Sequence, residues 1–293
     1  RSNSVDDLCD LGNEAWQNAN AFPGQISTLI VPADCAWGDF KGDIPQPLET
    51  IKPSAIDHSL ISESIETLKL DGSILFIGGK FLDESCLKLA AEISSATGCR
   101  IVTDTFISRI RRGAGLPIIE QVPYFAEMAE EFLKNTAGVV FIGTSVPVSF
   151  FAYPDKKSYL LPTETKIINL CSPNQDGHDA LNALSAESGS SSINQDLIQS
   201  SIIDIPTSGI LDTSSFGPLL AGLMPENAIV SDESATSSLF VTSHTLSAKP
   251  HDWLALTGGS IGQGLPLAVG AAIAKPDRPV ITLHGDGGAM YTI

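Results

Sequence analysis

Two glycine-rich segments near the end of the chain have the composition of a site for a phosphorylated cofactor and a divalent cation. The first is Gly258-Gly-Ser-Ile-Gly-Gln-Gly264, where positions without side chains allow the backbone to approach a ligand closely. The second is Gly285-Asp-Gly-Gly288, which places one carboxylate after a β-rich run. Because Mg²⁺ usually takes one or two carboxylates together with phosphate oxygens, Asp286 is the predicted metal ligand. A Gly-Asp-Gly tripeptide alone is also common in ordinary turns.

The segments around these glycines are typical of an open α/β sheet. Residues 265–274 predict a helix of small side chains that can pack tightly on a sheet, and residues 278–284 predict the strand that leads to Asp286. In such sheets ligands bind beyond the carboxyl ends of the strands, and a helix that begins there directs N–H groups at phosphate. We therefore expect the two glycine-rich segments to form one site.

Length, composition and charge exclude several classes of protein. The 293 residues are enough for about two domains at the usual ~100–200 residues per domain. The 34 acidic and 17 basic residues give a net charge of −17, which would repel a nucleic-acid backbone. No segment approaches the ~20 apolar residues of a membrane helix, and the first residues do not resemble a signal peptide. A soluble, cytoplasmic protein that binds neither nucleic acid nor membrane is expected.

The cysteines and histidines form no recognisable motif. The five cysteines are odd in number and scattered without a CxxC pair, so we predict structural thiols and neither disulfides nor a zinc site. The five histidines form no HxxxH or HxH pattern, and His178 and His251 fall in polar segments that we interpret as loops.

The first part of the chain reads as the end of a domain. Residues 5–18 predict a helix with Ser4 as its N-cap, and the β-branched residues 27–31 predict a strand. We interpret 1–41 as the last αβ unit of a domain and the proline-rich residues 42–55 as a linker. Because the chain lacks an initiator Met and ends without a helix stop signal, we expect a piece of a longer protein.

Residues 56–185 alternate between helical and β patterns, which predicts a doubly wound, parallel-sheet domain, complete in this chain. Gly78-Gly79 follows its first strand, but there is no GxGxxG, so a nucleotide-binding turn and a purely structural turn both remain open. The predicted helices are 56–69, 83–97 and 123–134, and the predicted strands are 73–77, 100–103, 138–142, 158–161 and 166–170.

The polar residues 186–208 predict a second linker, and 209–293 the first part of another domain. In that part, 216–223 predict a helix and 228–231 a strand that leads into the polar turn 232–238. Glu233, in this turn, is either a functional acid or a solvated loop acid, and the solvated interpretation is favoured.

The whole combination resembles the diphosphate-binding domain of thiamine diphosphate enzymes, in the group of acetolactate synthase, benzoylformate decarboxylase and pyruvate decarboxylase. The resemblance rests on Gly-Ser-Ile-Gly-x-Gly-Leu-Pro, a small-residue helix, Lys-Pro-Asp-Arg-Pro and a β run into Gly-Asp-Gly, and it extends to residues 227–236. Residues 56–185 are similar to the central domain of the family and 27–37 to the end of its pyrimidine-binding domain. The resemblance implies doubly wound α/β domains, with the flanking domains partial.

The resemblance also implies site residues. Asp286 would bind Mg²⁺, backbone N–H groups of Gly287, Gly288 and Ala289 would line the diphosphate, and the Gly259 carbonyl would accept from the aminopyrimidine. Ile261 would support the bent cofactor, unless it is ordinary core. The implied cofactor-binding set is Thr236, Gly259, Ser260, Ile261, Gly285, Asp286, Gly287, Gly288, Ala289 and Tyr291.

No catalytic residue is assigned, because the glutamate and the Asn-Asn pair that the family uses have no match here, and the chain itself is expected to be inactive. The implied reaction is decarboxylation of a 2-oxo acid, followed by carboligation or aldehyde release. A homo-oligomer, dimer or tetramer, with a shared active site is implied, and FAD remains open. The alternatives are a nicotinamide-dependent oxidoreductase, which predicts the absent GxGxxG, and a non-catalytic relative that keeps the fold.

Overall fold

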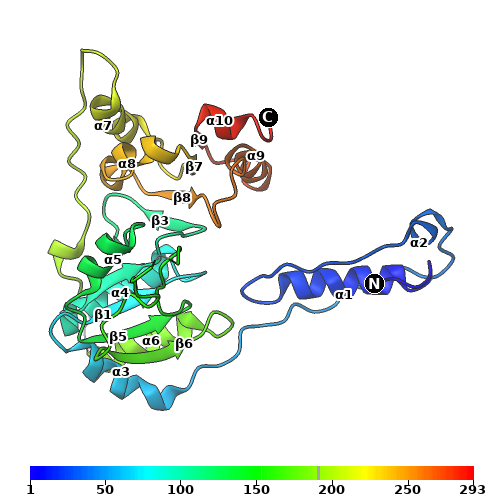
Figure 1. Cartoon of the computed structure of the whole chain (residues 1–293), viewed down its shortest axis with the longest axis horizontal. Coiled ribbons are helices and arrows are strands. Elements are labelled where there is room, and N and C mark those ends of the chain that lie inside the picture. The colour runs from blue at the N-terminus through cyan, green and yellow to red at the C-terminus, as the bar shows by residue number, and fades with distance from the viewer. Residues whose placement is uncertain (153, 190–191) are drawn as a thin grey trace.

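Two β-sheets, the first all parallel and the second mixed, form the main body of the molecule, and an N-terminal arm extends away from it (Figure 1). The computed structural model describes residues 1–152, 154–189 and 192–293. Within these ranges no helix is both long enough and apolar enough to cross a membrane. The predicted α/β class with parallel sheets is confirmed.

The first sheet has the strand order β4-β2-β1-β5-β6, and all of its pairings are parallel. The central strand β1 is completely buried because both faces of the sheet are covered. Its strands are β1 (Ile74–Ile77), β2 (Arg100–Thr103), β4 (Glu120–Gln121), β5 (Gly138–Ile142) and β6 (Lys166–Cys171).

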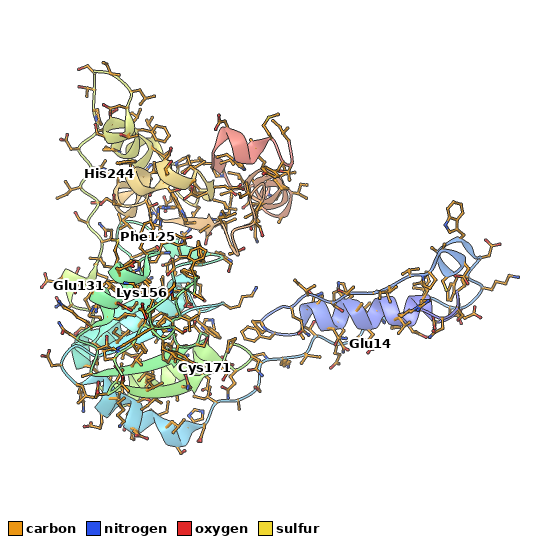
Figure 2. All side chains as sticks on the ribbon, viewed as in Figure 1. Glu14, Phe125, Glu131, Lys156, Cys171 and His244 are labelled. Carbon is orange, nitrogen blue, oxygen red and sulfur yellow. The ribbon has the colours of Figure 1, made fainter. Side chains whose placement is uncertain are left out.

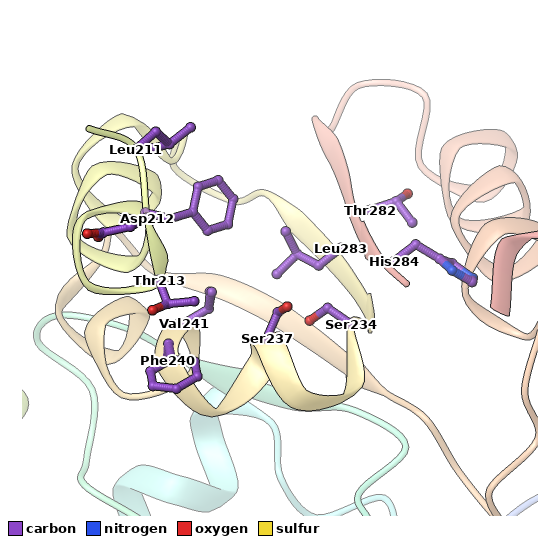
Figure 3. Close-up of a pocket in the computed structure, with 11 residues that line it drawn as sticks. Leu211, Asp212, Thr213, Ser234, Ser237, Phe240, Val241, Thr282, Leu283 and His284 are labelled. Carbon is purple, nitrogen blue, oxygen red and sulfur yellow. The ribbon is translucent and has the colours of Figure 1, made fainter. Parts of the chain in front are cut away.

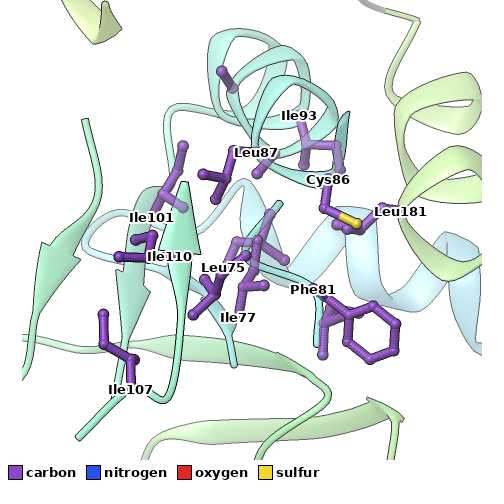
Figure 4. Packing of buried hydrophobic residues seen from close by; sticks show 14 of the residues in the cluster. Leu75, Ile77, Phe81, Cys86, Leu87, Ile93, Ile101, Ile107, Ile110 and Leu181 are labelled. Carbon is purple, nitrogen blue, oxygen red and sulfur yellow. The ribbon is translucent and has the colours of Figure 1, made fainter. Parts of the chain in front are cut away.

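Alternate side chains of β1 enter two different apolar clusters, as the period of a strand requires. Leu75 and Ile77 pack with the cluster that contains Leu87 and Leu181, from the two helices α4 (Glu84–Thr97) and α6 (Gly177–Ser188) (Figure 4). The intervening side chains, Ile74 and Phe76, face the second cluster with α5 (Ala126–Leu133). On the first face α3 (Ile61–Leu68) packs against α6, after the 3₁₀ turn η1 (His58–Leu60).

The second sheet has the strand order β3-β8-β7-β9. Here β7 (Ile229–Glu233) runs parallel to both β8 (His251–Ala255) and β9 (Val280–His284), with Glu233 opposite His284. The helix α9 (Gly264–Ala274) packs on β7 and β9. The other elements of this half are η2 (Gln195–Leu197), α7 (Thr213–Leu223), η3 (Ala235–Ser237), α8 (Ser238–Val241), η4 (His244–Ser247) and α10 (Asp286–Ala289).

The edge strand β3 (Ile110–Arg112) comes from the first half of the chain and pairs antiparallel with β8. Next to this pairing the Asp252 carboxylate, almost completely buried, accepts from Arg109 Nε at 2.9 Å and from Arg278 at 2.5 Å. The buried Arg112 guanidinium lies 3.8 Å from the ring centroid of Trp253. A strand, a shared carboxylate and a cation–π contact therefore attach residues 109–112, from the first half of the chain, to the second sheet.

The N-terminal arm consists of α1 (Leu8–Asn20), the short α2 (Ala33–Trp37) and an extended return segment. The return segment follows α1, with Asn13 Nδ2 donating to the Gln46 carbonyl at 2.6 Å and Gln17 Nε2 to the Glu49 carbonyl at 2.7 Å. Figure 2 shows side chains such as Glu14 projecting from the arm into solvent, away from the two sheets.

Several predicted elements are wrong or were missed. Residues 27–31 form no strand, because within the described ranges no other strand runs beside them. Residues 158–161 also form no strand and contribute one isolated bridge, between Val148 and Tyr159. His178 lies on the unpredicted helix α6 and His251 on the unpredicted strand β8, so both loop interpretations are wrong. The predicted N-cap Ser4 lies outside α1, which begins after Asp7.

Candidate functional site

The carboxylate of Glu233 organises the edge where the strands of the second sheet end. Glu233 is the last residue of β7, and its side chain is buried. Its Oε1 accepts from the Gly262 N–H at 2.5 Å and its Oε2 from the Gly264 N–H at 2.6 Å. The glycine-rich turn after β8 is therefore tied to the end of β7. The solvated interpretation of Glu233 is wrong.

The surroundings of Glu233 stabilise its charged form. Burial opposes ionisation, but the N–H groups of Gly262 and Gly264 and the adjacent His284 outweigh burial and lower the pKa of the Glu233 carboxyl. His284 Nε2 lies 3.2 Å from Glu233 Oε2, and its Nδ1 lies 2.8 Å from the Gly285 carbonyl oxygen. Glu233 is thus an ionised, positioned acid at neutral pH.

Two hydroxyl groups fix the other side of the same turn. Thr292 Oγ1 donates to the Gly262 carbonyl at 2.6 Å, and Ser231 Oγ donates to the Gly264 carbonyl at 2.8 Å. Both glycines are therefore held through their N–H and their C=O groups. None of Ser231, Glu233 and Thr292 belongs to the predicted cofactor-binding set.

Gly262 needs to be glycine for two reasons. Its φ is +93°, and a Cβ there would lie 2.8 Å from Tyr291 Cβ. We expect Gly262→Ala to lower the free energy of unfolding by about 2 kcal/mol, since a left-handed non-glycine residue costs roughly 1–3 kcal/mol. Urea denaturation measures this change. The matched control is Gly270→Ala in α9, where an added Cβ meets nothing within 4 Å and the helix should gain up to about 1 kcal/mol. Equal stability of the two variants would contradict the structure.

The predicted cofactor residues follow three adjacent parallel strands, so the fold brings them to one edge of the sheet. Gly259, Ser260 and Ile261 lie in the turn after β8, Thr236 lies in η3 after β7, and residues 285–289 follow β9. Ile261 is 58% exposed, so the interpretation of this residue as ordinary core is wrong.

The start of α10 is shaped by contact with Glu233. A Cβ on Gly288 would lie 2.7 Å from Glu233 Oε1, and the Gly285 N–H donates to the Glu233 carbonyl at 3.1 Å. Asp286 and Gly287 are exposed. The N–H groups of Gly287 and Gly288 fall in the first turn, where a helix has no internal acceptor for them. The edge thus offers an accessible carboxylate beside donor groups, a suitable combination for a magnesium-bound diphosphate.

Two predicted backbone groups have partners within the protein. The Ala289 N–H donates to the Gly285 carbonyl at 3.0 Å, and the Gly259 carbonyl accepts from the Ile261 N–H at 3.0 Å. The carbonyl has a second lone pair for a ligand, whereas the N–H has no second hydrogen.

A pocket of about 520 Å³ opens beside β9, between this strand and the helices α7 and α8 (Figure 3). No residue of the predicted cofactor-binding set lines it, although Ser234 and Ser237 flank Thr236 in sequence. Its lining residues are Leu211, Asp212, Thr213, Phe216, Ser234, Ser237, Phe240, Val241, Thr282, Leu283 and His284.

Packing accounts for the Gly78-Gly79 turn in the first sheet. A Cβ on Gly78 would lie 2.5 Å from Asp104 Oδ2, and one on Gly79 would lie 2.8 Å from the Gly143 carbonyl oxygen. The next helix, α4, is capped by the Asp83 carboxylate, which accepts from the N–H groups of Ser85 and Cys86. The first N–H groups of α4 are therefore already paired within the protein.

Comparison with known proteins gives a family-model match and a sequence match over most of the chain. Residues 234–293 match the family model described as thiamine pyrophosphate enzyme, C-terminal TPP binding domain. The Mycobacterium tuberculosis protein IlvX, whose name assigns it provisionally to the acetolactate synthase large subunits, is 39% identical over 280 residues. The alignment covers 96% of this chain and 53% of IlvX, so the chain spans about half the length of this curated relative.

Two solved structures are similar over nearly the whole chain. A Mycobacterium smegmatis protein, described provisionally as a thiamin diphosphate-dependent enzyme, matches 99% of this chain and 60% of its own, with a TM-score of 0.71 and 18% identity. The thiamine diphosphate-dependent 4-hydroxybenzoylformate decarboxylase of Rhodococcus jostii RHA1 matches 99% and 58%, with a TM-score of 0.67 and 19% identity. At these identities the structures establish the shared fold.

Proposed function

We propose that the edge around Glu233 binds the diphosphate of thiamine diphosphate with Mg²⁺, which is supported by the family-model match over residues 234–293 and by the similarity to IlvX. One observation carries the proposal: the glycine turn, Asp286 and the first turn of α10 meet at the carboxyl ends of β8, β7 and β9, and the Glu233 carboxylate contacts two of the three. No comparison names these residues, so their roles are our inference.

Each residue of the edge has a distinct role in the proposal. Asp286 supplies a carboxylate oxygen to Mg²⁺, and the N–H groups of Gly287 and Gly288 donate to diphosphate oxygens. The exposed side chain of Ile261 provides an apolar support for the cofactor ring system. Glu233 holds the glycine turn in place through Gly262 and Gly264.

We further propose that the protein acts on a small 2-oxo acid, releasing CO₂ and then either joining the product to a second carbonyl compound or releasing an aldehyde. When bound, thiamine diphosphate supplies the carbon centre that takes up the electron pair left by CO₂. The support is the names of the relatives, which include acetolactate synthases and decarboxylases. Release of CO₂ from pyruvate or benzoylformate, with acetolactate measured alongside, distinguishes these outcomes.

Binding calorimetry with thiamine diphosphate and Mg²⁺ tests the cofactor proposal without relying on activity. We expect Asp286→Asn to weaken Mg²⁺-dependent binding about 10- to 100-fold, the equivalent of one lost charged interaction of roughly 1.5–3 kcal/mol. The matched control is Asp277→Asn, another exposed acid, in the turn before β9, which should leave binding unchanged. Absence of binding, or equal binding in both variants, would refute the proposed site.

The same proposal includes assembly into a dimer or tetramer, with the active site shared between subunits. It also places the protein in the cytoplasm. The support for assembly comes from the apolar side of α9, where Val269 is 60% and Ile273 is 76% exposed. These side chains lie on the helix that follows the glycine turn, so a second subunit packed there would lie close to the proposed cofactor site.

A further inference from the structure

We propose that Asp83, Cys86 and His178 form a binding site for a divalent transition-metal ion, with zinc as the ion that best matches these ligands. The three residues belong to the first sheet and its helices, and none of them takes part in the proposed cofactor site. The sequence predicted no zinc site, because the motif search relied on ligands close together in the chain.

The fold brings the three residues together at the start of two neighbouring helices. Asp83 is the N-cap of α4 and Cys86 is the third residue of that helix, while His178 is the second residue of α6. The two helices pack against each other, and Figure 4 shows the Cys86 side chain directed from α4 toward Leu181 of α6. Asp83 and Cys86 are close in sequence, but His178 follows Cys86 by 92 residues. Only the tertiary structure therefore reveals the cluster.

The separations between the ligand atoms match those of a tetrahedral ion. His178 Nε2 lies 3.3 Å from Asp83 Oδ2 and 3.5 Å from Cys86 Sγ, and ligand atoms of all three residues lie within 4.8 Å of one another. Zinc bonds of about 2.0–2.3 Å at tetrahedral angles place nitrogen and oxygen ligands about 3.4 Å apart and nitrogen and sulfur ligands about 3.5 Å apart. Because Cys86 Sγ is nearly equidistant from the two ring nitrogens, the His178 ring would have to turn so that the lone pair of one nitrogen points at the ion.

Without an ion, the thiol also has a hydrogen-bond partner in Asp83, whereas its contact with His178 has no single preferred nitrogen. Cys86 Sγ is almost equally distant from the two ring nitrogens of His178, at 3.3 Å from Nδ1 and 3.5 Å from Nε2. A directional hydrogen bond would favour one nitrogen, because the donor and acceptor directions of the two nitrogens diverge in the ring plane.

The cluster is open to solvent on one side and closed on the other. The Cys86 side chain is fully buried, whereas the side chains of Asp83 and His178 remain 36% and 48% exposed. An ion could therefore enter between the exposed pair, and a water molecule could complete its coordination. Sites with three protein ligands and one open position are common for zinc.

Negative charge lies beside the cluster, because the Asp83 carboxylate is close to the Cys86 thiol. A bound ion would displace the thiol proton, as metal binding to cysteine requires. The Asp176 carboxylate near Cys86 adds further negative charge, which helps to offset the positive ends of the two helices.

Cobalt substitution tests the site directly. One molar equivalent of Co²⁺ added to the chain should produce a near-ultraviolet thiolate-to-cobalt charge-transfer band. It should also produce visible absorption bands with the intensity typical of tetrahedral Co²⁺, and Zn²⁺ should abolish both. We expect Cys86→Ser to lose the thiolate band and His178→Gln to bind Co²⁺ at least about tenfold more weakly. Binding should also raise the thermal midpoint of the wild-type chain.

Two matched variants serve as controls. Cys9→Ser removes a thiol in the arm, and His58→Gln removes an exposed histidine that pairs with Asp179 at 2.8 Å, and both should keep the full cobalt spectrum. Circular dichroism shows whether Cys86→Ser is folded. If it is not, the cobalt spectrum of His178→Gln, a substitution of a partly exposed residue, tests the site. Absence of a thiolate band in the wild-type chain, or an unchanged spectrum in Cys86→Ser or His178→Gln, would overturn the proposal.

Discussion

Replacing Glu233 with alanine is expected to lower the free energy of unfolding by about 3 kcal/mol and to abolish detectable binding of thiamine diphosphate. The substitution removes the acceptor of two charge-assisted hydrogen bonds, each worth roughly 1.5–3 kcal/mol, and leaves the buried N–H groups of Gly262 and Gly264 unpaired. Urea denaturation followed by the fluorescence of Trp253, which is buried in the adjacent strand β8, measures the stability.

The control for Glu233 is Glu226→Ala, which removes an exposed acid in the turn before β7 and should change stability by less than about 0.5 kcal/mol.

Acid titration gives an independent check. Because the folded-state pKa of Glu233 lies below the usual value of 4.5, its stabilisation is complete above about pH 4.5 and is lost as the pH falls through the lower folded-state pKa. The alanine variant should lack this part of the acid transition. A variant as stable as the control would show that the turn is held by other contacts.

Replacing Asp252 with alanine is the second substitution with a large expected effect, again about 3 kcal/mol. Removing one partner of a buried ion pair typically costs roughly 3–5 kcal/mol, and the exposure of Arg109 places this case at the lower limit. Arg278, which is mostly buried, loses its carboxylate partner, and Arg111 loses a charge 3.7 Å away. Hydrogen exchange should show faster exchange in both β3 and β8.

The control for Asp252 is Asp277→Ala, which removes an exposed acid that lines one pocket together with Asp252. We expect no change in exchange of β3 and less than about 0.5 kcal/mol in stability. Equal protection of β3 in both variants would mean that its backbone pairing with β8, without the shared carboxylate, is sufficient to join the sheets.

The sequence predicts a helix or strand well where the apolar residues of that segment follow a clear pattern without help from other segments. The short β runs at β1, β2 and β5 were predicted as strands of a parallel sheet, and residues 83–97 were predicted as the helix that α4 forms. It fails where another part of the chain decides the structure. β3, with two arginines in three residues, becomes a strand only because β8 offers an unpaired edge. Residues 27–31 have β propensity but no partner strand in the described ranges.

The candidate site was predicted only in part for a related reason. Asp286 and the glycines carry a local pattern, so their types and spacing predicted an edge that the fold does assemble. Glu233, Ser231 and Thr292 act on the backbone of residues that are close to them only in the folded chain. The available sequence signal was the β run 228–231 leading directly into Asp232 and Glu233, because an acid at the end of a buried strand needs partners.

The origin of β3 has a consequence for how the chain can be divided. Cutting within residues 186–208 separates the sequence into two halves but divides one hydrogen-bonded sheet, since β3 would leave with the first half. The second half alone would expose the edge of β8 and leave Asp252 paired with Arg278 but without Arg109, and an open strand edge is a template for aggregation. We therefore expect the second half to aggregate when it is expressed without β3.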